Sequence, residues 1–486
     1  MKKILSLFFV VFLSLQLVTS AYAEVKLPAI ISSNMVLQRN TEVPLWGWAD
    51  AEEEITIQAS WLTEVVKTKA DESGSWIIQV RTTTSKEAQT IRITSENADI
   101  KLQNILFGEV WLCSGQSNME QPMAGYGVDQ PTFESLKTIA RAHNKNIRLF
   151  SVERNGSKTP LNDVEKYRPW EESNPDNVLK FSALAYFFGQ QLQEILDVPV
   201  GIIHTSWGGS DIKPWISKEV MNTFEKVDIA DADLSHRTNH IPTVLFNAMI
   251  HPLIPYRIKG ALWYQGESNR KEPEEYTNLF PAMVNDWRTR WKIGEFPFYF
   301  VQIAPYYYNN YDAFQSVENT AFMREAQLQC AQLIPNSGMA VLLDIGAEKC
   351  IHPPKKKEAA ERLLYHALNK TYGFKSLDCE SPVYESMEIK DGGIELGFKH
   401  AETGIYSFGE LEGFEIAGKD KVFYPAKAEI VFKKKKVFVK SDKVTEPLAV
   451  RYAWGNWVVG TLFDVNLLPA SSFRTDNWDD ATRFGN

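Results

Sequence analysis

The strongest constraint on the fold is a change of hydrophobic periodicity along the chain. From Gly108 to about residue 371, short apolar runs alternate with stretches in which apolar residues recur every three or four positions. This alternation predicts a mostly parallel, doubly wound α/β sheet, because parallel strands need a crossover connection, usually a helix. In such sheets the active site forms at the carboxyl ends of the strands. We expect strands at 110–113, 147–152, 198–204, 260–264, 296–303 and 339–343, and helices at 181–196, 276–291, 315–334 and 355–371.

Both flanks of this region have the pattern of β structure. They contain short segments in which apolar and polar residues alternate, separated by Gly, Asp and charged turns. A chain of 486 residues suits two or three domains. We therefore predict an N-terminal β-sandwich domain over 24–106, a catalytic α/β domain over 107–376 and a C-terminal β domain over 377–486.

The first 23 residues are predicted to be a signal peptide that is removed from the mature protein. Two lysines precede an apolar stretch over 4–19, and the small residues at 21–23 (AYA) form a cleavage pattern. The alternative is a membrane anchor, but the apolar stretch is short for a hydrocarbon core of about 30 Å. We expect cleavage after Ala23 and a secreted or periplasmic protein without a membrane span.

Charge and cysteine content narrow the function classes. The chain has 52 Lys and Arg against 61 Asp and Glu, which gives a net charge of −9. This argues against a protein that binds nucleic acid or an anionic membrane, because such a protein needs a basic surface. The four cysteines have no C-x-x-C spacing, so they predict neither a metal site nor a disulfide framework. One bridge, Cys350–Cys379, is possible in an oxidising compartment. The 14 Trp and 18 Tyr fit either core packing or a sugar-binding surface.

Three loops that follow predicted strands carry residues suited to catalysis. Residues 113–120 (CSGQSNME) place a serine on a strand-to-helix turn, where it can act as nucleophile and offer its backbone N–H to an oxyanion. Residues 263–269 (WYQGESN) offer two amides and a carboxylate, and residues 344–354 (DIGAEKCIHPP) offer a histidine as general base. Each loop alone also fits a capping residue, a polar turn or a surface histidine. Together, at one edge of the sheet, they predict one active site.

At these loops the chain resembles the sialate O-acetylesterase family within the SGNH hydrolases. The motifs that carry the resemblance are GQSN at 115–118, QGESN at 265–269 and IHP at 351–353. The resemblance implies an SGNH-type, flavodoxin-like sheet and an exported carbohydrate O-acetylesterase. Its partner would be an acetylated sugar or glycan, and it would use no metal or organic cofactor. Further similar segments lie at 33–40 (SNMVLQRN), 206–209 (SWGG), 411–418 (LEGFEIAG) and 449–454 (AVRYAW).

The resemblance also implies catalytic roles for matching residues. Ser117 would be the nucleophile and His352 the base. Many SGNH enzymes have an Asp three residues before the histidine, where this chain has Lys349. Glu267 is the preferred third member of a triad, Asp344 and Glu348 are alternatives, and a Ser–His dyad is the remaining possibility.

The same resemblance suggests residues that stabilise the oxyanion and contact the sugar. The oxyanion donors would be the backbone N–H groups of Ser117 and Gly209 and the side-chain amide of Gln265 or Asn269. Candidate substrate contacts are Gln116, Asn118, Trp207, Tyr264 and Arg324, together with the aromatic residues Trp215, Tyr306, Tyr307 and Tyr308. The aromatic side chains fit ordinary packing equally well, and Arg324 fits a surface salt bridge.

Other functions fit parts of the pattern. An acetylxylan esterase acting on plant polysaccharide would use the same residues. A non-catalytic carbohydrate-binding protein is the alternative from another class, and it is kept open by Lys349 at the position of the usual acid. A lipase or thioesterase would instead need an apolar acyl groove.

Overall fold

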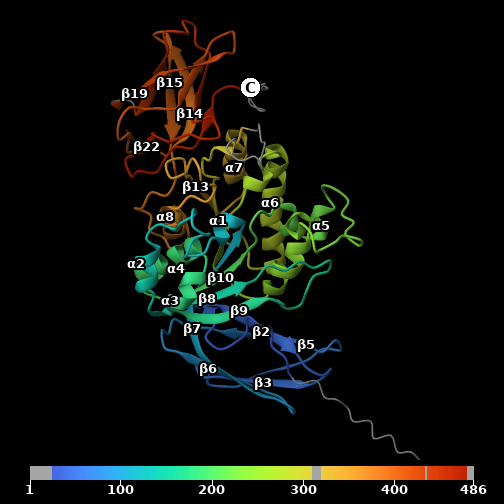
Figure 1. Cartoon of the computed structure of the whole chain (residues 1–486). Helices are drawn as coiled ribbons and strands as arrows, with labels where there is room; N and C mark the ends of the chain where they lie inside the picture. The colour runs from blue at the N-terminus through green and yellow to red at the C-terminus, as the bar shows by residue number, and fades with distance from the viewer. Residues whose placement is uncertain (1–24, 309–318, 433–434, 479–486) are drawn as a thin grey trace, which may run out of the picture.

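The computed structural model describes residues 25–308, 319–432 and 435–478. The predicted signal peptide therefore lies outside the described residues. Figure 1 shows N-terminal strands at one end, a central region in which helices flank a sheet, and C-terminal sheets at the other end.

The central sheet has the strand order β13-β12-β11-β7-β10-β8-β9. Its neighbouring strands are parallel except for the antiparallel pair of β8 and β9, which confirms the mostly parallel α/β prediction. The strands are β7 (Asp99–Gly115), β8 (Asn144–Val152), β9 (Tyr167–Ser173), β10 (Val200–Ser206), β11 (Gly260–Tyr264), β12 (Phe298–Val301) and β13 (Ser337–Ala340).

The flavodoxin-like strand order is not what the structure has. In that order the first parallel strand lies between the second and the third. Here β10 pairs with one edge of β7 and β11 with the other, so β8 has no free edge of β7 to join and pairs with β10 instead. The doubly wound architecture is kept, but β7 and β10 have exchanged places relative to that order.

Helices cover both faces of this sheet, as the apolar periodicity predicts. The predicted helices at 181–196, 276–291 and 355–371 are found, and the one at 315–334 is found over 321–333, with residues 309–318 outside the described residues. The α-helices are α1 (Ser117–Glu120), α2 (Ser135–Ala140), α3 (Pro175–Lys180), α4 (Ala183–Leu196), α5 (Lys218–Met221), α6 (Pro273–Trp291), α7 (Ala321–Leu333) and α8 (Lys356–His366). Shorter 3₁₀ or π turns cover Lys213–Trp215, Thr238–His240, Phe246–Ile250, His251–Leu253, Glu267–Asn269 and Ala367–Thr371.

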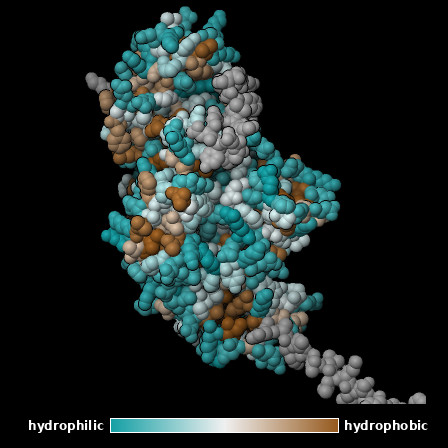
Figure 2. Space-filling model, in the orientation of Figure 1, coloured by the Kyte–Doolittle hydropathy of each residue, from teal (hydrophilic) through white to brown (hydrophobic). Residues whose placement is uncertain are grey.

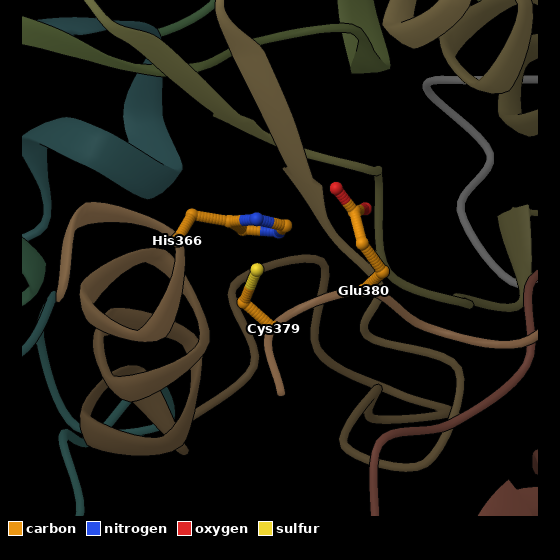
Figure 3. Close-up of side chains that lie close together, drawn as sticks. All are labelled: His366, Cys379 and Glu380. Carbon is orange, nitrogen blue, oxygen red and sulfur yellow. The ribbon is translucent and has the colours of Figure 1, made fainter. Parts of the chain in front are cut away.

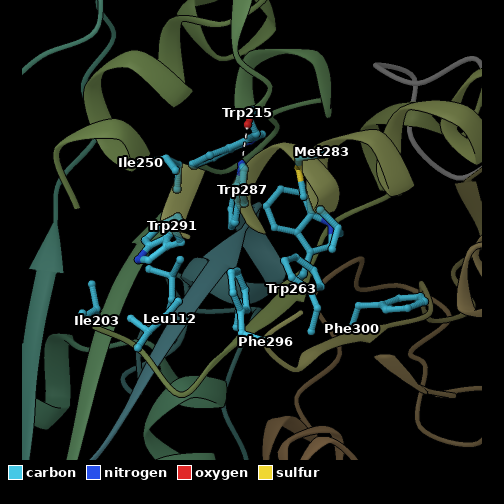
Figure 4. Close-up of a cluster of buried hydrophobic side chains, with 14 of the residues drawn as sticks. Leu112, Ile203, Trp215, Ile250, Trp263, Met283, Trp287, Trp291, Phe296 and Phe300 are labelled. Atoms are coloured by element: carbon cyan, nitrogen blue, oxygen red, sulfur yellow. Dashed lines mark hydrogen bonds between the residues drawn. The ribbon is translucent and has the colours of Figure 1, made fainter. Parts of the chain in front are cut away.

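Alternate residues of β7 belong to two different cores. Val110 and Leu112 pack with α6 on one face, whereas Trp111 and Cys113 pack with α4 and α8 on the other. Figure 4 shows the first core, where Trp263 of β11 and Trp287 of α6 lie beside Trp215. The indole of Trp287 donates a hydrogen bond to the Trp215 carbonyl at 3.0 Å. Much of the tryptophan content is therefore used in core packing.

The N-terminal strands continue directly into the central sheet. The first half of β7 pairs with β6 and its second half with β10 and β11, so the boundary predicted at 106/107 falls inside one strand. The antiparallel pair β2–β5 and the sheet containing β3, β4 and β6 share one apolar cluster with residues such as Leu45 and Ile57. These strands are β1 (Val36–Gln38), β2 (Glu42–Trp48), β3 (Glu54–Ala59), β4 (Val66–Lys69), β5 (Ser75–Arg81) and β6 (Gln89–Thr94).

The C-terminal region is antiparallel β structure, as its alternating pattern predicts. It has sheets with the orders β14-β15-β20-β19 and β18-β17-β21-β23, and a short pair β16–β22. The strands are β14 (Val383–Lys390), β15 (Gly393–Lys399), β16 (Ile405–Tyr406), β17 (Phe414–Ala417), β18 (Phe423–Pro425), β19 (Lys427–Val431), β20 (Lys436–Lys440), β21 (Ala449–Tyr452), β22 (Phe463–Asp464) and β23 (Phe473–Arg474).

Surface and cysteine features complete the fold. The face in Figure 2 is mostly hydrophilic, with scattered apolar patches. Among the described helices, none combines the length and apolar character that a membrane span requires. Each of the four cysteines is a free thiol, so the bridge considered for Cys350 and Cys379 is wrong. The Cys350 thiol instead donates to the His352 carbonyl at 3.1 Å, and Cys379 lies beside His366 and Glu380.

Candidate active site

The three predicted loops meet at the carboxyl edge of the sheet. The first follows β7, the second follows β11 and the third follows β13. Gly115 ends β7 with φ +140°, and a Cβ there would lie 2.1 Å from the Tyr264 carbonyl oxygen, so only glycine permits this approach. The next N–H, of Gln116, donates to the same carbonyl at 2.9 Å. The backbone thus binds the first two loops together.

Ser117 begins α1 and is half-buried beside the SWGG loop. A Cβ added to Gly208 would lie 3.3 Å from the Ser117 Cβ, so this loop sits against the serine. Gly209 has φ +72°, a conformation that favours glycine. Within the described residues, the N–H groups of Ser117 and Gly209 have no hydrogen-bond acceptor. They are available to an oxyanion formed at Ser117.

The SWGG loop is positioned by Glu120, which was not among the predicted site residues. The Glu120 carboxylate accepts hydrogen bonds from the Gly208 N–H at 3.0 Å and the Tyr126 hydroxyl at 3.1 Å. It also binds the Arg154 guanidinium in a bidentate pair. Since Glu120 lies in the same short helix as Ser117, this contact fixes the loop relative to the serine.

The His352 loop joins the serine through Tyr126 and Asn118. The Tyr126 hydroxyl donates to the Ser117 carbonyl at 3.1 Å, and its ring packs edge-on against the His352 ring at 5.1 Å. The Asn118 amide donates to the Ile351 carbonyl at 3.1 Å. No direct hydrogen bond joins the Ser117 hydroxyl to the His352 ring in the described part of the chain, which is common before substrate binds.

The orienting partner of His352 is Gln130. The distance from His352 Nδ1 to Gln130 Oε1 is 2.7 Å. Because an amide oxygen only accepts, Nδ1 carries the proton and Nε2 is the basic nitrogen. Burial, reinforced by the positive charge of Lys356, lowers the pKa of His352 to about 3. The ring is therefore neutral over most of the pH range, as a general base requires.

Glu267 contacts Asn118 rather than His352, which differs from the triad expected from the sequence. The Asn118 amide donates to Glu267 Oε1 at 2.5 Å, and its oxygen accepts from Lys356 Nζ. Burial raises the pKa of Glu267 and lowers the pKa of Lys356 to about 7. Asn118 thus bridges a buried carboxylate and a buried amine directly behind Ser117.

The two alternative acids, Asp344 and Glu348, also make no hydrogen bond to His352 within the described residues. Asp344 forms a bidentate pair with Arg362, with oxygen–nitrogen distances of 2.7 and 2.6 Å. Glu348 is exposed. The hydrogen-bond partner of the His352 ring is instead the neutral amide of Gln130.

The amide side chains of the first two loops hold the loops together. Gln265 Nε2 donates to Asn269 Oδ1 at 2.7 Å and to the Ser210 carbonyl at 3.2 Å, so both of its amide hydrogens are used. Asn269 Oδ1 also accepts from the Ile212 N–H at 3.0 Å. Gln116 Oε1 accepts from the backbone of the second loop. The oxyanion role expected for Gln265 is therefore not supported by its hydrogen bonds.

Arg324 and two aromatic residues do not reach a substrate. Arg324 is fully buried, and its guanidinium donates to Ser472 Oγ at 2.7 Å and to the Gly455 carbonyl at 2.6 Å. It therefore ties α7 to the C-terminal region. Tyr264 and Trp215 are fully buried as well, so the sequence-based assignment of these three side chains to a sugar surface is wrong.

Two aromatic candidates keep exposed surface beside the site. Trp207 of the SWGG loop is half-buried, and Tyr307 is 37% exposed, whereas Tyr306 and Tyr308 are buried. A pocket of about 430 Å³ adjoins the His352 loop. It is lined by Asp129, Gln130, Tyr306, Ala347, Lys349, Cys350 and Ile351.

The residues that sequence reasoning missed have weak sequence signals. Gln130 and Tyr126 lie in a loop without periodicity, and Lys356 stands in a run of three lysines that resembles a solvated helix start. Within the described residues, the one group of His, Cys and acidic side chains close enough to bind a metal is His366, Cys379 and Glu380, which are not part of this site.

Comparisons with known proteins show which family of esterases the chain is similar to. Residues 107–346 match the family model of carbohydrate esterases described as sialic acid-specific acetylesterase. The human sialate O-acetylesterase is 28% identical over 88% of this chain and 87% of its own length, and the mouse enzyme is 26% identical over 88% and 89%. The crystal structure of a carbohydrate acetylesterase from Xanthomonas citri is 32% identical, with a TM-score of 0.84 over 93% of this chain and 100% of the other.

Proposed function

Because the chain belongs to the sialate O-acetylesterase family of carbohydrate esterases and is a carboxylic ester hydrolase, we propose that it removes acetyl groups from sugars through Ser117 and His352. The observation that carries the proposal is the junction of their two loops. Tyr126 contacts both residues, and Asn118 links the turn that holds Ser117 to the residue before His352.

In this proposal His352 Nε2 takes the Ser117 proton as the serine oxygen attacks the acetyl carbonyl. The N–H groups of Ser117 and Gly209 stabilise the oxyanion of the tetrahedral intermediate. The proton then passes from His352 to the departing sugar oxygen, leaving an acetyl-serine. Water attacks this ester while His352 accepts its proton, and the proton returns to Ser117 as acetate leaves.

In this mechanism Gln130 has the orienting role that an acid has in a triad. Its hydrogen bond to Nδ1 selects the tautomer with a basic Nε2. A neutral amide orients the ring but adds no negative charge to stabilise the imidazolium. Glu267 would act at a distance, by holding Asn118 and through it the turn that carries Ser117.

The sugar is proposed to lie between Trp207 and the pocket beside His352. An indole can stack on a sugar ring, and Trp207 is partly exposed in the SWGG loop, next to Gly208, which lies against Ser117. Lys349 lines the pocket and is exposed. Its charge could pair with the carboxylate of a sialic acid, which favours an O-acetyl sialic acid over neutral acetylated xylan.

Acetate release tests this proposal. Wild type, Ser117→Ala and His352→Ala are compared on 4-nitrophenyl acetate, O-acetyl sialic acids and acetylated xylan. Ser114→Ala is the matched control, because Ser114 lies in the same segment but its hydroxyl is buried without a partner among the described residues. Activity that is lost in Ser117→Ala and His352→Ala and kept in Ser114→Ala supports the proposal. Equal activity of wild type and Ser117→Ala would refute it, and activity that rises with acyl length would indicate a lipase or thioesterase.

We also propose that the protein is exported after cleavage following Ala23, on the pattern of residues 1–23. Expression of the full chain in a bacterial host, followed by N-terminal sequencing of the mature protein, tests this. A mature chain that retains Met1 would contradict it.

A further inference from the structure

A second group of reactive side chains lies away from Ser117. His366 ends α8, whereas Cys379 and Glu380 lie in the segment that leads to β14. One ligand atom of each residue lies within 4.8 Å of the other two. Figure 3 shows the His366 ring extending from the helix toward Cys379 and Glu380.

The His366 ring has no other evident function in this position. It is 1% exposed, and neither ring nitrogen makes a hydrogen bond of ordinary geometry within the described residues. It is held between Tyr299, whose ring stacks at 5.7 Å, and Gly338, where an added Cβ would lie 2.5 Å from Nδ1. Buried polar groups are nearly always paired, so two unpaired nitrogens beside a thiol and a carboxylate need an explanation.

We propose that His366, Cys379 and Glu380 bind a Zn²⁺ ion. Imidazole nitrogen, thiolate sulfur and carboxylate oxygen are the ligand types of zinc sites. A thiolate and a carboxylate together neutralise the two charges of the ion, and the thiol proton leaves to solvent when the metal binds. Three ligands leave one position of a tetrahedral site for water.

Lys370 binds one oxygen of the Glu380 carboxylate and leaves the other oxygen for a metal. Its ammonium group pairs with Glu380 Oε1 and donates to the Ser337 carbonyl at 2.6 Å. A carboxylate has a second oxygen, which can bind the metal while Oε1 keeps the lysine. Such outer contacts orient metal ligands in known sites.

The site would fasten the segment between α8 and β14 to the edge of the central sheet. His366 is at one end of α8 and Lys356 at the other. At a rise of about 1.5 Å per residue, the helix separates the two ends by roughly 15 Å. The metal therefore has a structural role and takes no part in the ester hydrolysis proposed above, so the two proposals can fail separately.

Metal content of the purified full chain tests this proposal. Apoprotein is prepared with a chelator, incubated with zinc and desalted, and bound metal is measured by mass spectrometry. We expect about one equivalent in wild type. Cobalt substitution should give a thiolate-to-metal charge-transfer band in the ultraviolet. Zinc should also raise the melting temperature of the apoprotein, by mass action.

Matched variants separate this site from adventitious binding. Cys379→Ser and Glu380→Gln should bind little zinc, and the charge-transfer band should be lost in Cys379→Ser. Cys330→Ser is the control, since Cys330 is also a buried free thiol but lies in α7. Circular dichroism establishes that each variant is folded. Wild type without bound zinc, or equal zinc in wild type and both ligand variants, would overturn the proposal.

Discussion

Replacing Gln130 by Glu should shift the pH dependence of hydrolysis. In the wild type, His352 Nδ1 donates to a neutral oxygen at 2.7 Å, and burial keeps the pKa of the ring at about 3. A carboxylate at hydrogen-bond distance typically raises the pKa of a cationic partner by about 1–3 units. Since the proposed base His352 can accept a proton only when it is neutral, activity should be lost as pH falls through its pKa. The acid limb should therefore move upward by about 1–3 pH units.

Replacing Gln130 by Ala should lower the rate without adding charge. A neutral hydrogen bond contributes about 0.5–1.5 kcal/mol, and 1.36 kcal/mol corresponds to a tenfold change in rate. We therefore expect kcat/KM at neutral pH to fall by about 2- to 13-fold. Gln130→Glu should instead raise the rate at neutral pH, because the carboxylate stabilises the imidazolium that forms in the transition state.

The measurement is the pH profile of kcat/KM for 4-nitrophenyl acetate. Asp129→Asn is the control, because Asp129 lines the same pocket beside Gln130 and is absent from the contacts of His352. Its acid limb should coincide with that of the wild type. A folded Gln130→Glu protein whose acid limb also coincides with the wild type would refute the assignment of Gln130 as the partner of His352.

Further predictions concern buried charge and substrate choice. Arg324→Met should lower the melting temperature by several degrees and leave KM unchanged in the folded fraction, because the guanidinium hydrogen-bonds only protein groups; scanning fluorimetry and steady-state kinetics test this. Lys356→Met should lower the free energy of urea unfolding by up to about 3–5 kcal/mol, because it removes one of the two cations, Lys356 and Arg270, whose charge favours the buried Glu267 carboxylate. Adding Glu267→Gln should restore most of the loss. Burial lowers the pKa of Lys356 from 10.5 to about 7, so between these values the unfolded chain binds a proton that the folded chain does not. Stability should therefore rise with pH across that window, and the rise should be smaller in Lys356→Met. Lys349→Ala should raise KM for O-acetyl sialic acids and leave KM for acetylated xylan unchanged in acetate-release assays.

The sequence predicts the elements of the fold because their signals are local. Runs such as 110–113 and 260–264 are continuous and apolar, and buried parallel strands require this. The positions of Ser117 and His352 follow, because loops after parallel strands share one edge of the sheet. Strand order is not local: β8 joins β10 because both edges of β7 are already paired.

Contacts between distant segments explain the errors at the site. Arg324 stands on a helix whose sequence (FMREAQ) gives no sign of burial, and it is buried by residues from 453 to 472. Gln130 meets His352 across a separation of 222 residues. Glu267 was expected to contact the histidine, but its Oε1 accepts a hydrogen bond from the Asn118 amide instead.

Lys349 stands where many SGNH enzymes have an acid, and this difference has a chemical consequence for His352. An acid beside the histidine would stabilise the imidazolium and raise its pKa; here the partner is an amide, and the charge of buried Lys356 lowers the pKa further. A histidine with an ordinary pKa of about 6.5 is only about 3% neutral at pH 5, whereas one with a pKa of about 3 is almost fully neutral there. In the proposed mechanism, this arrangement makes His352 a weaker base but keeps it unprotonated in acid. More of the transition-state stabilisation then falls to the N–H groups of Ser117 and Gly209, and activity should persist at acid pH where a triad histidine would already be protonated.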